Sequence, residues 1–255
     1  MPSALFDLGG RTALVTGSSR GLGRAIAEGM AASGAAVVLN GVDPGRVAAT
    51  ASSMRNAGFT AHEAPFDVTD EAAVLATFER LDRDGIEIDI LVNNAGIQFR
   101  RPMLELETAD FRRVVETHLT SAFVLGREAA RRMIPRGRGK IINIGSLTSD
   151  LGRATIAPYA AAKGGVRMLT RVMTAEWAEH GIQANAIGPG YMETDLNEAL
   201  IQNEQFNAWV IGRTPARRWG KPDELVGAAV FLASAASDFV NGQILYVDGG
   251  FTAVM

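Results

Sequence analysis

Short apolar segments alternate with longer amphipathic segments along the whole chain. The short ones are rich in Val, Ile and Leu and are bounded by turn-forming residues, a pattern typical of buried strands. The longer ones repeat apolar residues every three or four positions, as helices do. This alternation predicts an α/β fold: one doubly wound, Rossmann-type sheet of about seven parallel strands with helices on both faces. The predicted strands cover residues 12–16, 36–40, 59–66, 89–92, 139–145, 182–187 and 243–247.

The alternation continues from end to end, so we expect a single domain over residues 1–255. Two long helices are predicted over residues 108–133 and 158–180. Residues 194–219 depart from the pattern because they combine large side chains with helical spacing. We expect this segment to be a helical excursion on the side of the domain where a substrate binds.

Composition narrows the classes of function. The formal net charge is −3, so nothing indicates a nucleic acid or an anionic membrane as a partner. The absence of cysteine excludes disulfides, thiolate zinc sites and cysteine nucleophiles, and the sequence predicts no metal site. Neither a signal peptide nor an apolar run of membrane-spanning length is visible. We therefore expect a soluble cytoplasmic protein.

The segment after the first predicted strand has the chemistry of a phosphate site. Its glycines are spaced Gly-x3-Gly-x-Gly, and an alanine-rich helix follows. Glycines let backbone N–H groups approach a pyrophosphate, and a helix N-terminus adds partial positive charge. The alternative is a tight turn that only packs the helix on the sheet. We expect a dinucleotide to be bound by Gly17, Ser19, Arg20, Gly21, Leu22 and Gly23.

The end of the second predicted strand indicates which dinucleotide binds. An acid there binds the ribose 2′-hydroxyl of NAD, whereas basic residues accommodate the 2′-phosphate of NADP. Gly41 stands where the acid is expected, and Arg20 could reach a phosphate. The pattern favours NADP; NAD is the alternative, with Arg20 merely solvated. Asp43 follows two residues later and could begin the next helix, with Pro44 in its first position.

Small and polar residues follow other strands at the same edge of the sheet. Ligands of open α/β sheets bind at this edge, so we expect these residues to line the cofactor site. The alternative is structural, since asparagines can tie loop backbones together and Asp67 can cap structure rather than touch the adenine. The residues concerned are Asn40, Asp67, Val68, Asn94, Ala95 and Gly96.

Tyr159 and Lys163 are four residues apart in a predicted helix and therefore share one of its faces. A phenol beside an ammonium is an acid–base device, because the positive charge favours phenolate and lowers the pKa of the tyrosine. Ser146 lies thirteen residues before Tyr159, just past the end of the fifth strand. The plain alternative is that Tyr159 packs and Lys163 is solvated.

Five groups of residues together resemble the short-chain dehydrogenase/reductase family in order and spacing, over essentially the whole chain. The resemblance implies hydride transfer between a nicotinamide and a carbonyl/alcohol pair. It implies Tyr159 as general acid and base, Ser146 as the holder of the substrate oxygen, and Lys163 as a ligand of the nicotinamide ribose that lowers the tyrosine pKa. The groups are residues 16–23, 93–96, 146, 159–163 and 189–194; the last implies cofactor contacts from Pro189, Gly190, Met192 and Thr194.

One position departs from the family pattern. Most members have an asparagine in the long helix where this chain has His118. The resemblance implies that a water held there belongs to a proton relay behind Lys163. Because histidine can also bind a water and can titrate near neutral pH, we hypothesise that His118 keeps the relay with an altered pH dependence. The alternative is a packed helix residue.

Within the family, residues 6–8, 149–153 and 213–220 resemble the gluconate 5-dehydrogenases, also called 5-keto-gluconate reductases. This implies an NADP(H)-preferring enzyme whose substrate is a small anionic sugar acid such as gluconate or 5-keto-gluconate. Arg100, Arg101 and Arg153 could bind its carboxylate, beside Ser146 and Tyr159.

Other activities are compatible with the same sequence features. Within the family, the alternatives are a 3-oxoacyl-[acyl-carrier-protein] reductase and another sugar or polyol dehydrogenase. A non-catalytic nucleotide-binding regulator is the remote alternative, since Ser146, Tyr159 and Lys163 are all intact. Members of this type are usually tetramers, so the resemblance also implies a homotetramer.

Overall fold

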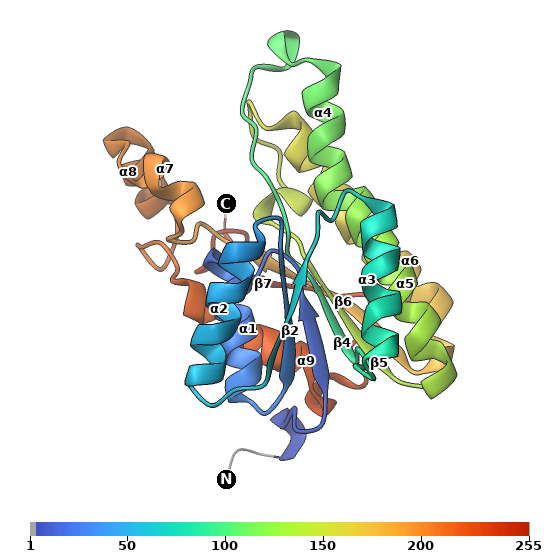
Figure 1. The fold of residues 1–255 in the computed structure, drawn as a ribbon. Helices are drawn as coiled ribbons and strands as arrows, with labels where there is room; N and C mark the ends of the chain where they lie inside the picture. Colours follow the sequence, from blue (N-terminus) through green and yellow to red (C-terminus); the bar gives the residue numbers. More distant parts are fainter. Residues whose placement is uncertain (1–3, 255) are drawn as a thin grey trace.

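The computed structural model describes residues 4–254, which contain a seven-stranded, all-parallel sheet (Figure 1). The strand order is β3-β2-β1-β4-β5-β6-β7. The predicted doubly wound parallel sheet is confirmed. The strands are β1 Thr12–Val15, β2 Ala36–Gly41, β3 Ala61–Pro65, β4 Ile90–Asn93, β5 Gly139–Ile144, β6 Ile182–Pro189 and β7 Ile244–Val247.

Helices connect the strands, and local chemistry sets where they start. The side chain of Asp43 accepts a hydrogen bond from the N–H of Arg46 at 3.1 Å, and Asp70 caps α3 in the same way. Pro44 stands in the first turn of α2, where a missing N–H is no loss. No helix in the described part of the chain is long and apolar enough to cross a membrane. The α-helices are α1 Gly21–Ala32, α2 Pro44–Asn56, α3 Glu71–Arg83, α4 Thr108–Val115, α5 Ser121–Met133, α6 Ala157–Trp177, α7 Glu198–Ile201, α8 Glu204–Arg213 and α9 Val226–Ala233.

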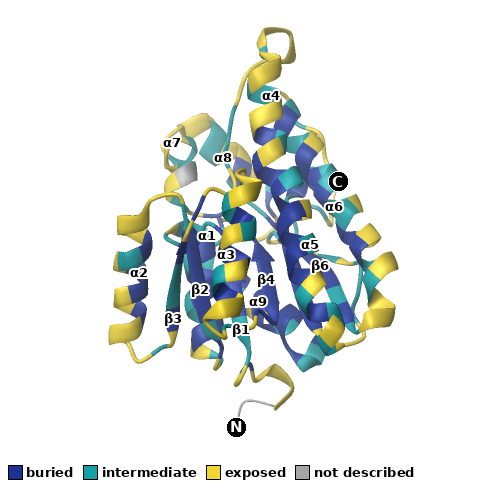
Figure 2. Ribbon diagram, turned by 45° about the vertical axis from the view of Figure 1, so that its right-hand side comes forward, coloured by how far each residue is buried: buried dark blue, intermediate teal, exposed yellow. Residues whose placement is uncertain are grey.

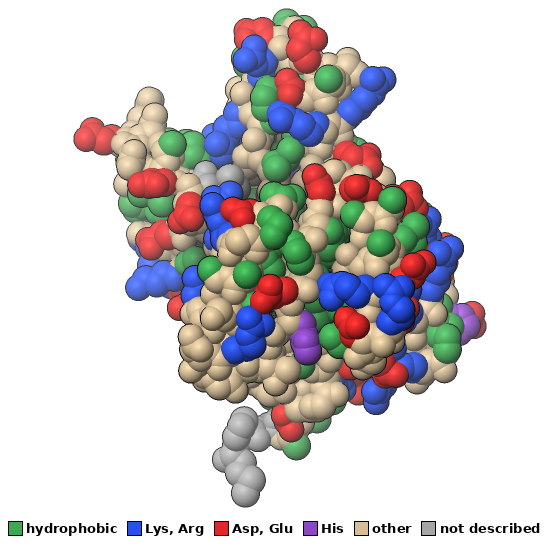
Figure 3. Space-filling view, viewed as in Figure 1, with side chains coloured by type: hydrophobic (Ala, Val, Ile, Leu, Met, Phe, Trp, Pro, Cys, Tyr) green, Lys and Arg blue, Asp and Glu red, His purple; other side chains and the backbone are tan. Residues whose placement is uncertain are grey.

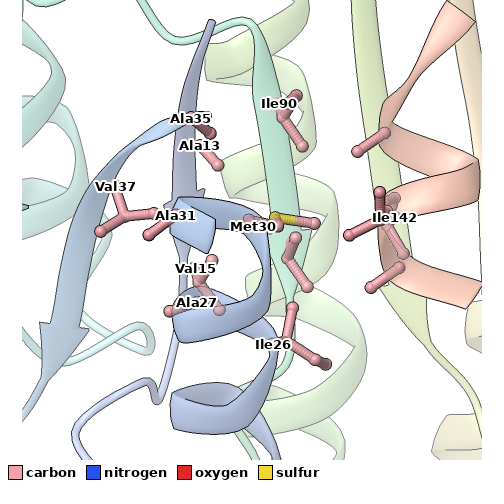
Figure 4. Close-up of a cluster of buried hydrophobic side chains, with 14 of the residues drawn as sticks. Ala13, Val15, Ile26, Ala27, Met30, Ala31, Ala35, Val37, Ile90 and Ile142 are labelled. Atoms are coloured by element: carbon pink, nitrogen blue, oxygen red, sulfur yellow. The ribbon is translucent and has the colours of Figure 1, made fainter. Parts of the chain in front are cut away.

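Two apolar cores lie on opposite faces of the sheet, because successive side chains of a strand point to opposite sides. Val15 packs with residues of α1, α2 and α9, whereas its neighbour Leu14 packs with residues of α3, α5 and α6. Figure 4 shows part of the first core, with Met30 of α1 lying among side chains of the central strands. Figure 2 shows the same pattern over the whole molecule: buried strands and helices with exposed outer faces.

The strand order reverses between β1 and β4, and this reversal creates the ligand site. From β1 the chain moves outward through β2 and β3, and then returns to place β4 on the other side of β1. The loops after β1 and β4 therefore diverge and leave a crevice at the carboxyl edge of the sheet. The predicted excursion at residues 194–219 contains α7 and α8, which stand apart from the layers of the fold (Figure 1).

The structure differs from the prediction in one helix and two strands. The helix predicted over residues 108–133 contains a π-helical turn at Glu116–Thr120, between α4 and α5. A π turn inserts one residue and is frequent at functional sites, and here it carries His118. Apolar spacing does not reveal it, because the buried face continues on either side. The third strand begins at Ala61 rather than at Phe59, and the sixth extends to Pro189.

We predict that Phe78→Ala lowers the free energy of unfolding by about 3–5 kcal/mol, because it leaves a cavity in the core under α3. The Phe78 side chain is 0% exposed. Denaturant unfolding measures the change. Phe239→Ala is the matched control: Phe239 is 104% exposed, so the change should stay within about 0.5 kcal/mol. Equal losses in the two variants would contradict the packing described above.

Candidate active site

The glycine loop and the start of α1 form one wall of the crevice. Gly17 and Gly21 have φ angles of 63° and 57°, in the left-handed region that glycine adopts without strain. A Cβ atom at Gly23 would lie 2.4 Å from the carbonyl oxygen of Gly17, so only glycine fits there. The loop therefore packs closely on a helix N-terminus, as a pyrophosphate site requires.

Two asparagines hold this wall in place. The Nδ2 of Asn94 donates to the Thr16 carbonyl oxygen at 2.8 Å, and the Thr16 hydroxyl accepts from the N–H groups of Asn94 and Ala95 at 2.9 and 3.0 Å. The Oδ1 of Asn40 accepts from the Gly17 N–H at 3.1 Å, and its Nδ2 donates to two carbonyl oxygens at the end of β3. Asn40 is 1% exposed. The side chain is used within the protein and shapes the loop, and a direct contact of Asn40 with the cofactor stays a prediction.

The end of β2 carries no acid that faces the glycine loop. A Cβ at Gly41, the last residue of β2, would lie 3.1 Å from the Ser19 hydroxyl oxygen. Arg20 follows Ser19 and is exposed at the start of α1. Asp43 caps α2, which confirms its structural alternative. At the end of β2, where an acid would bind the ribose of NAD, the chain therefore has Gly41, and the exposed Arg20 follows Ser19 in the glycine loop.

Other residues predicted at the cofactor site have contacts of their own. Asp67 accepts hydrogen bonds from the N–H and the hydroxyl of Thr69 at 2.9 and 2.8 Å, which close the turn before α3. Its side chain is exposed, and its role at the cofactor site stays a prediction. Val68 is buried in the core on the α3 face, and Leu22 packs against the other core. A Cβ at Gly96 would lie 2.2 Å from the His118 ring, so this glycine makes room for the histidine.

Ser146, Tyr159 and Lys163 come together beyond the end of β5. The Ser146 hydroxyl oxygen accepts from the N–H and the hydroxyl of Thr148 at 3.2 and 3.1 Å. Lys163 is 4% exposed, and its Nζ donates to the Ile144 carbonyl oxygen at 2.5 Å. The same Nζ lies 5.6 Å from the centre of the Tyr159 ring. The three predicted catalytic side chains therefore share one site.

The pKa of the tyrosine departs from the prediction. Burial raises the pKa of Tyr159, while a hydrogen bond with Ser146 and the charge of Arg100 act in the opposite direction. Burial also lowers the pKa of Lys163 to about 7, because the ammonium loses its hydration. The prediction that Lys163 lowers the pKa of Tyr159 is thus wrong: the pKa is raised. Desolvation dominates, and a lysine that readily loses its proton stabilises phenolate less.

His118 is a buried, neutral residue of the π turn. Its Nε2 lies 2.8 Å from the Ile97 carbonyl oxygen, and its ring packs edge-on against Tyr159 with 5.1 Å between the ring centres. Burial, followed by the charge of Lys163, lowers the pKa of His118 to about 3. The hypothesis that His118 titrates near neutral pH is therefore corrected. Its Nδ1 is buried and has no hydrogen-bond partner within residues 4–254.

The turn after β6 is fixed by its own backbone contacts. A Cβ at Gly190 would lie 2.6 Å from the chain that follows β7. Met192 is buried, and its carbonyl oxygen accepts from Asn197 Nδ2 at 2.9 Å. The N–H of Asn197 donates to the Thr194 carbonyl oxygen at 2.8 Å. These contacts hold residues 189–194 at the carboxyl edge, where the family resemblance expects the nicotinamide.

Of the three predicted substrate arginines, Arg100 lies near Tyr159, and Arg153 lies near Arg100 and Tyr191. Partial burial and the charge of Arg153 lower the pKa of Arg100, whereas Tyr191 and Tyr159 raise it. Arg153 Nη1 donates to the Tyr191 hydroxyl at 3.3 Å. Arg101 is exposed and uses its backbone N–H to bind the loop before α6. In Figure 3, basic side chains border the notch between the α7–α8 segment and α4.

Sequence reasoning misses one residue of this site, Tyr191. It lies in the turn after β6, yet its phenol shares a neighbourhood with Arg100 and Arg153. The available signal was the run of large aromatic residues in the excursion, which predicts helices but not what they pack on. The ring of Tyr191 contacts the rings of Phe206, Trp209, Trp219 and Phe251.

Known proteins share this arrangement over nearly their full lengths. Residues 17–252 match the family model described as Enoyl-(Acyl carrier protein) reductase. The chain is 50% identical over 248 residues to the Gluconate 5-dehydrogenase of Gluconobacter oxydans, which covers 97% of each chain. It is 47% identical over 246 residues to the 5-keto-D-gluconate 5-reductase of Escherichia coli K12, covering 96% of this chain and 97% of the relative. A crystal structure of a gluconate 5-dehydrogenase from Burkholderia cenocepacia, in complex with NADP and tartrate, is 52% identical, covers 99% of each chain and has a TM-score of 0.97.

We predict that His118→Asn leaves the shape of the pH–rate profile unchanged between about pH 5 and pH 9. With a pKa of about 3 the ring is neutral throughout this range, so removing it deletes no titration. The height of the profile should fall, because the ring packs against Tyr159. Steady-state rates over the pH range measure this. A limb near pH 6.5 that the wild type has and the variant lacks would show instead that His118 titrates during turnover.

Geometry and similarity lead to the same assignment. The glycine loop packs closely on the N-terminus of α1, as in the dinucleotide-binding sites of doubly wound folds. Ser146, Tyr159 and Lys163 lie together beyond the end of β5. The protein is an NAD(P)-dependent dehydrogenase acting on CH–OH groups, and the chain belongs to the short-chain dehydrogenase/reductase family.

Proposed function

We propose that this enzyme is an NADP(H)-preferring oxidoreductase that interconverts gluconate and 5-keto-gluconate. The observation that carries the proposal is the pair Arg100 and Arg153: the two charges act on each other, and that of Arg100 also acts on Tyr159. Two guanidinium groups at a ketone-reducing centre suit a substrate with a carboxylate at one end and a reacting carbinol near the other. The sugar-acid enzymes among its relatives support the same assignment.

The chain's own residues supply orientation and a proton. A nicotinamide, when bound, supplies or accepts the hydride. The Ser146 hydroxyl, held by Thr148, is placed to hold the substrate oxygen. The Tyr159 hydroxyl gives its proton to that oxygen during ketone reduction and takes it back during alcohol oxidation. Lys163 lies next to the ring, and with a pKa of about 7 its protonated and neutral forms are nearly equal in population at neutral pH. It can therefore help to return a proton to the Tyr159 hydroxyl.

NADP preference follows from what borders the ribose end of the crevice. No acid faces Ser19 from the end of β2, and Arg20 is exposed beside it. A 2′-phosphate would gain a guanidinium partner there and would meet no carboxylate. The relative from Burkholderia cenocepacia crystallised with NADP supports this choice.

A 3-oxoacyl-[acyl-carrier-protein] reductase is the second candidate within the family. Such a substrate is a long, largely apolar acyl chain on a carrier protein. The arginine pair favours a small anion over that chain, because an apolar chain would take water from the two guanidinium groups without offering them a partner. We therefore keep the sugar acid as the substrate class.

We also infer a cytoplasmic homotetramer, the usual assembly of related enzymes. Helices α5 and α6 expose Phe123, Met168 and Val172, which are 45%, 55% and 44% exposed. Large apolar side chains at this exposure on neighbouring helices are typical of surfaces that pack against another copy of the chain.

We predict that Arg20→Ala raises the KM for NADPH about 10- to 100-fold and leaves the KM for NADH within about twofold. The variant removes a charge-assisted bond that only the 2′-phosphate can make. Arg24→Ala is the matched control, since Arg24 lies one turn further along α1 and pairs with Glu28 at 2.8 Å. If Arg20→Ala weakens both cofactors equally, the guanidinium does not select the phosphate.

We predict that the wild type oxidises NADPH with 5-keto-gluconate and that Arg153→Ala raises the KM for this substrate about 10- to 100-fold. Loss of a charged hydrogen bond to a carboxylate has this magnitude. The KM for a neutral ketohexose should change far less. Absorbance of NADPH follows both reactions.

Two results would contradict the substrate assignment. One is failure of the wild type to turn over 5-keto-gluconate while it reduces a 3-oxoacyl thioester. The other is an equal rise in KM for the charged and the neutral ketone in Arg153→Ala. Arg83→Ala, at the exposed end of α3, controls for a general effect of removing an arginine.

A further inference from the structure

The Tyr191 hydroxyl lies near both arginines of the proposed substrate site. Within residues 4–254 it has one hydrogen bond, accepted from Arg153 Nη1 at 3.3 Å. A phenol that accepts from a guanidinium still has its own O–H proton to donate. That proton has no acceptor in the described part of the chain. The Tyr191 O–H group can therefore donate a hydrogen bond to an acceptor on a bound ligand.

The ring of Tyr191 is fixed from several sides. Aromatic side chains contact it edge-on, with ring centres 5.5–5.9 Å away. Edge-to-face contacts of this kind restrict the orientation of a ring as well as its position. The aromatic cluster thus aims the hydroxyl at one point. Its members are Tyr191, Phe206, Trp209, Trp219 and Phe251.

Arg153 is held by the same cluster. Its guanidinium lies over the Phe206 ring, 4.5 Å from the ring centre, and its Nη1 reaches Tyr191. A guanidinium stacked on a ring and bonded to a phenol loses little further freedom when an anion binds. The cluster therefore prepares both Tyr191 and Arg153 for one ligand.

The charges around the Tyr191 hydroxyl favour an anionic ligand. The charge of Arg153 contributes to the lowered pKa of Arg100, so the two guanidinium groups repel each other. Among the described residues, no carboxylate forms an ion pair with either of them. Burial raises the pKa of Tyr191, so its hydroxyl keeps its proton at neutral pH. Two cations and one neutral O–H donor converge without an internal acceptor.

We propose that the Tyr191 hydroxyl is the third donor of the substrate-carboxylate site: it accepts from Arg153 and donates its proton to a carboxylate oxygen. The inference rests on the proposed function and adds a residue that decides its specificity. Tyr191 takes no part in the proton transfer to the substrate ketone, which belongs to Tyr159. Its contribution is to the binding of acids over neutral sugars.

Three tyrosines allow a matched experiment, since the chain contains Tyr159, Tyr191 and Tyr246. Tyr191→Phe keeps the aromatic packing and removes only the hydroxyl. Tyr246→Phe is the control, because the Tyr246 hydroxyl bonds Asp150 on the surface. Binding of tartrate, a small hydroxylated dicarboxylate, to the NADP-loaded enzyme is measured by calorimetry and needs no turnover. We expect a Kd about 5- to 20-fold higher in Tyr191→Phe and unchanged in Tyr246→Phe.

The second measurement separates a direct donor from a support of Arg153. If Tyr191 donates to the anion, Tyr191→Phe weakens tartrate binding further in an Arg153→Ala background, and it raises the KM for a carboxylated ketone more than its kcat falls. An unchanged Kd in Tyr191→Phe overturns the proposal. So does a loss that disappears once Arg153 is removed, because Tyr191 would then act only by positioning the arginine.

Failure of the proposed function would give a different combination of binding and turnover results from failure of the role of Tyr191. If the enzyme binds tartrate through Tyr191 but does not reduce 5-keto-gluconate, the anion site stands and the assigned sugar acid is wrong. If the wild type reduces 5-keto-gluconate and Tyr191→Phe binds tartrate normally, the substrate stands and the role of Tyr191 is wrong. The two readouts therefore fail independently.

Discussion

The hydrogen bonds between Thr16 and the Asn94–Ala95 backbone are the contact on which the site depends. A parallel sheet that reverses its strand order leaves two diverging loops, and nothing in the sheet itself fixes the distance between them. The Thr16 hydroxyl accepts from both N–H groups of the β4 loop, and Asn94 returns a bond to the β1 loop. Because these bonds join the two loops, the glycine loop and the loop after β4 keep one relative position, and a cofactor can lie across them.

Burial of polar groups gives the site its chemistry. Lys163 has a backbone carbonyl as its hydrogen-bond partner, and desolvation brings its pKa to about 7. The same desolvation holds Tyr159 in its protonated form and His118 in its neutral form. A proton donor in a dry pocket with a lysine close to half-protonated is suited to reactions in both directions. A site with a permanent ammonium beside the phenol would favour phenolate and alcohol oxidation.

Features set by local pattern could be predicted from the sequence, and features set by packing could not. The sheet, the glycine loop and the Tyr159–Lys163 pair depend on spacing within a few residues. The roles of Asn40 and Asp67 depend on which partner takes each side chain, and a sequence offers several. The π turn at His118 and the place of Tyr191 depend on contacts between segments distant in sequence. Desolvation reverses the expected direction of the Tyr159 pKa, because burial is a property of the fold.

The arginine pair links specificity to reaction position. Two like charges side by side destabilise the empty site, and a carboxylate relieves this repulsion by neutralising both. A neutral sugar cannot do so, and a long acyl chain would leave the repulsion in place while adding apolar surface beside it. In the proposed function the carboxylate is fixed at this pair, and the length of the carbon chain then decides which carbinol reaches Tyr159. Regioselectivity then follows from the distance between an anion site and a proton donor, both held by rigid packing rather than by contacts with each hydroxyl.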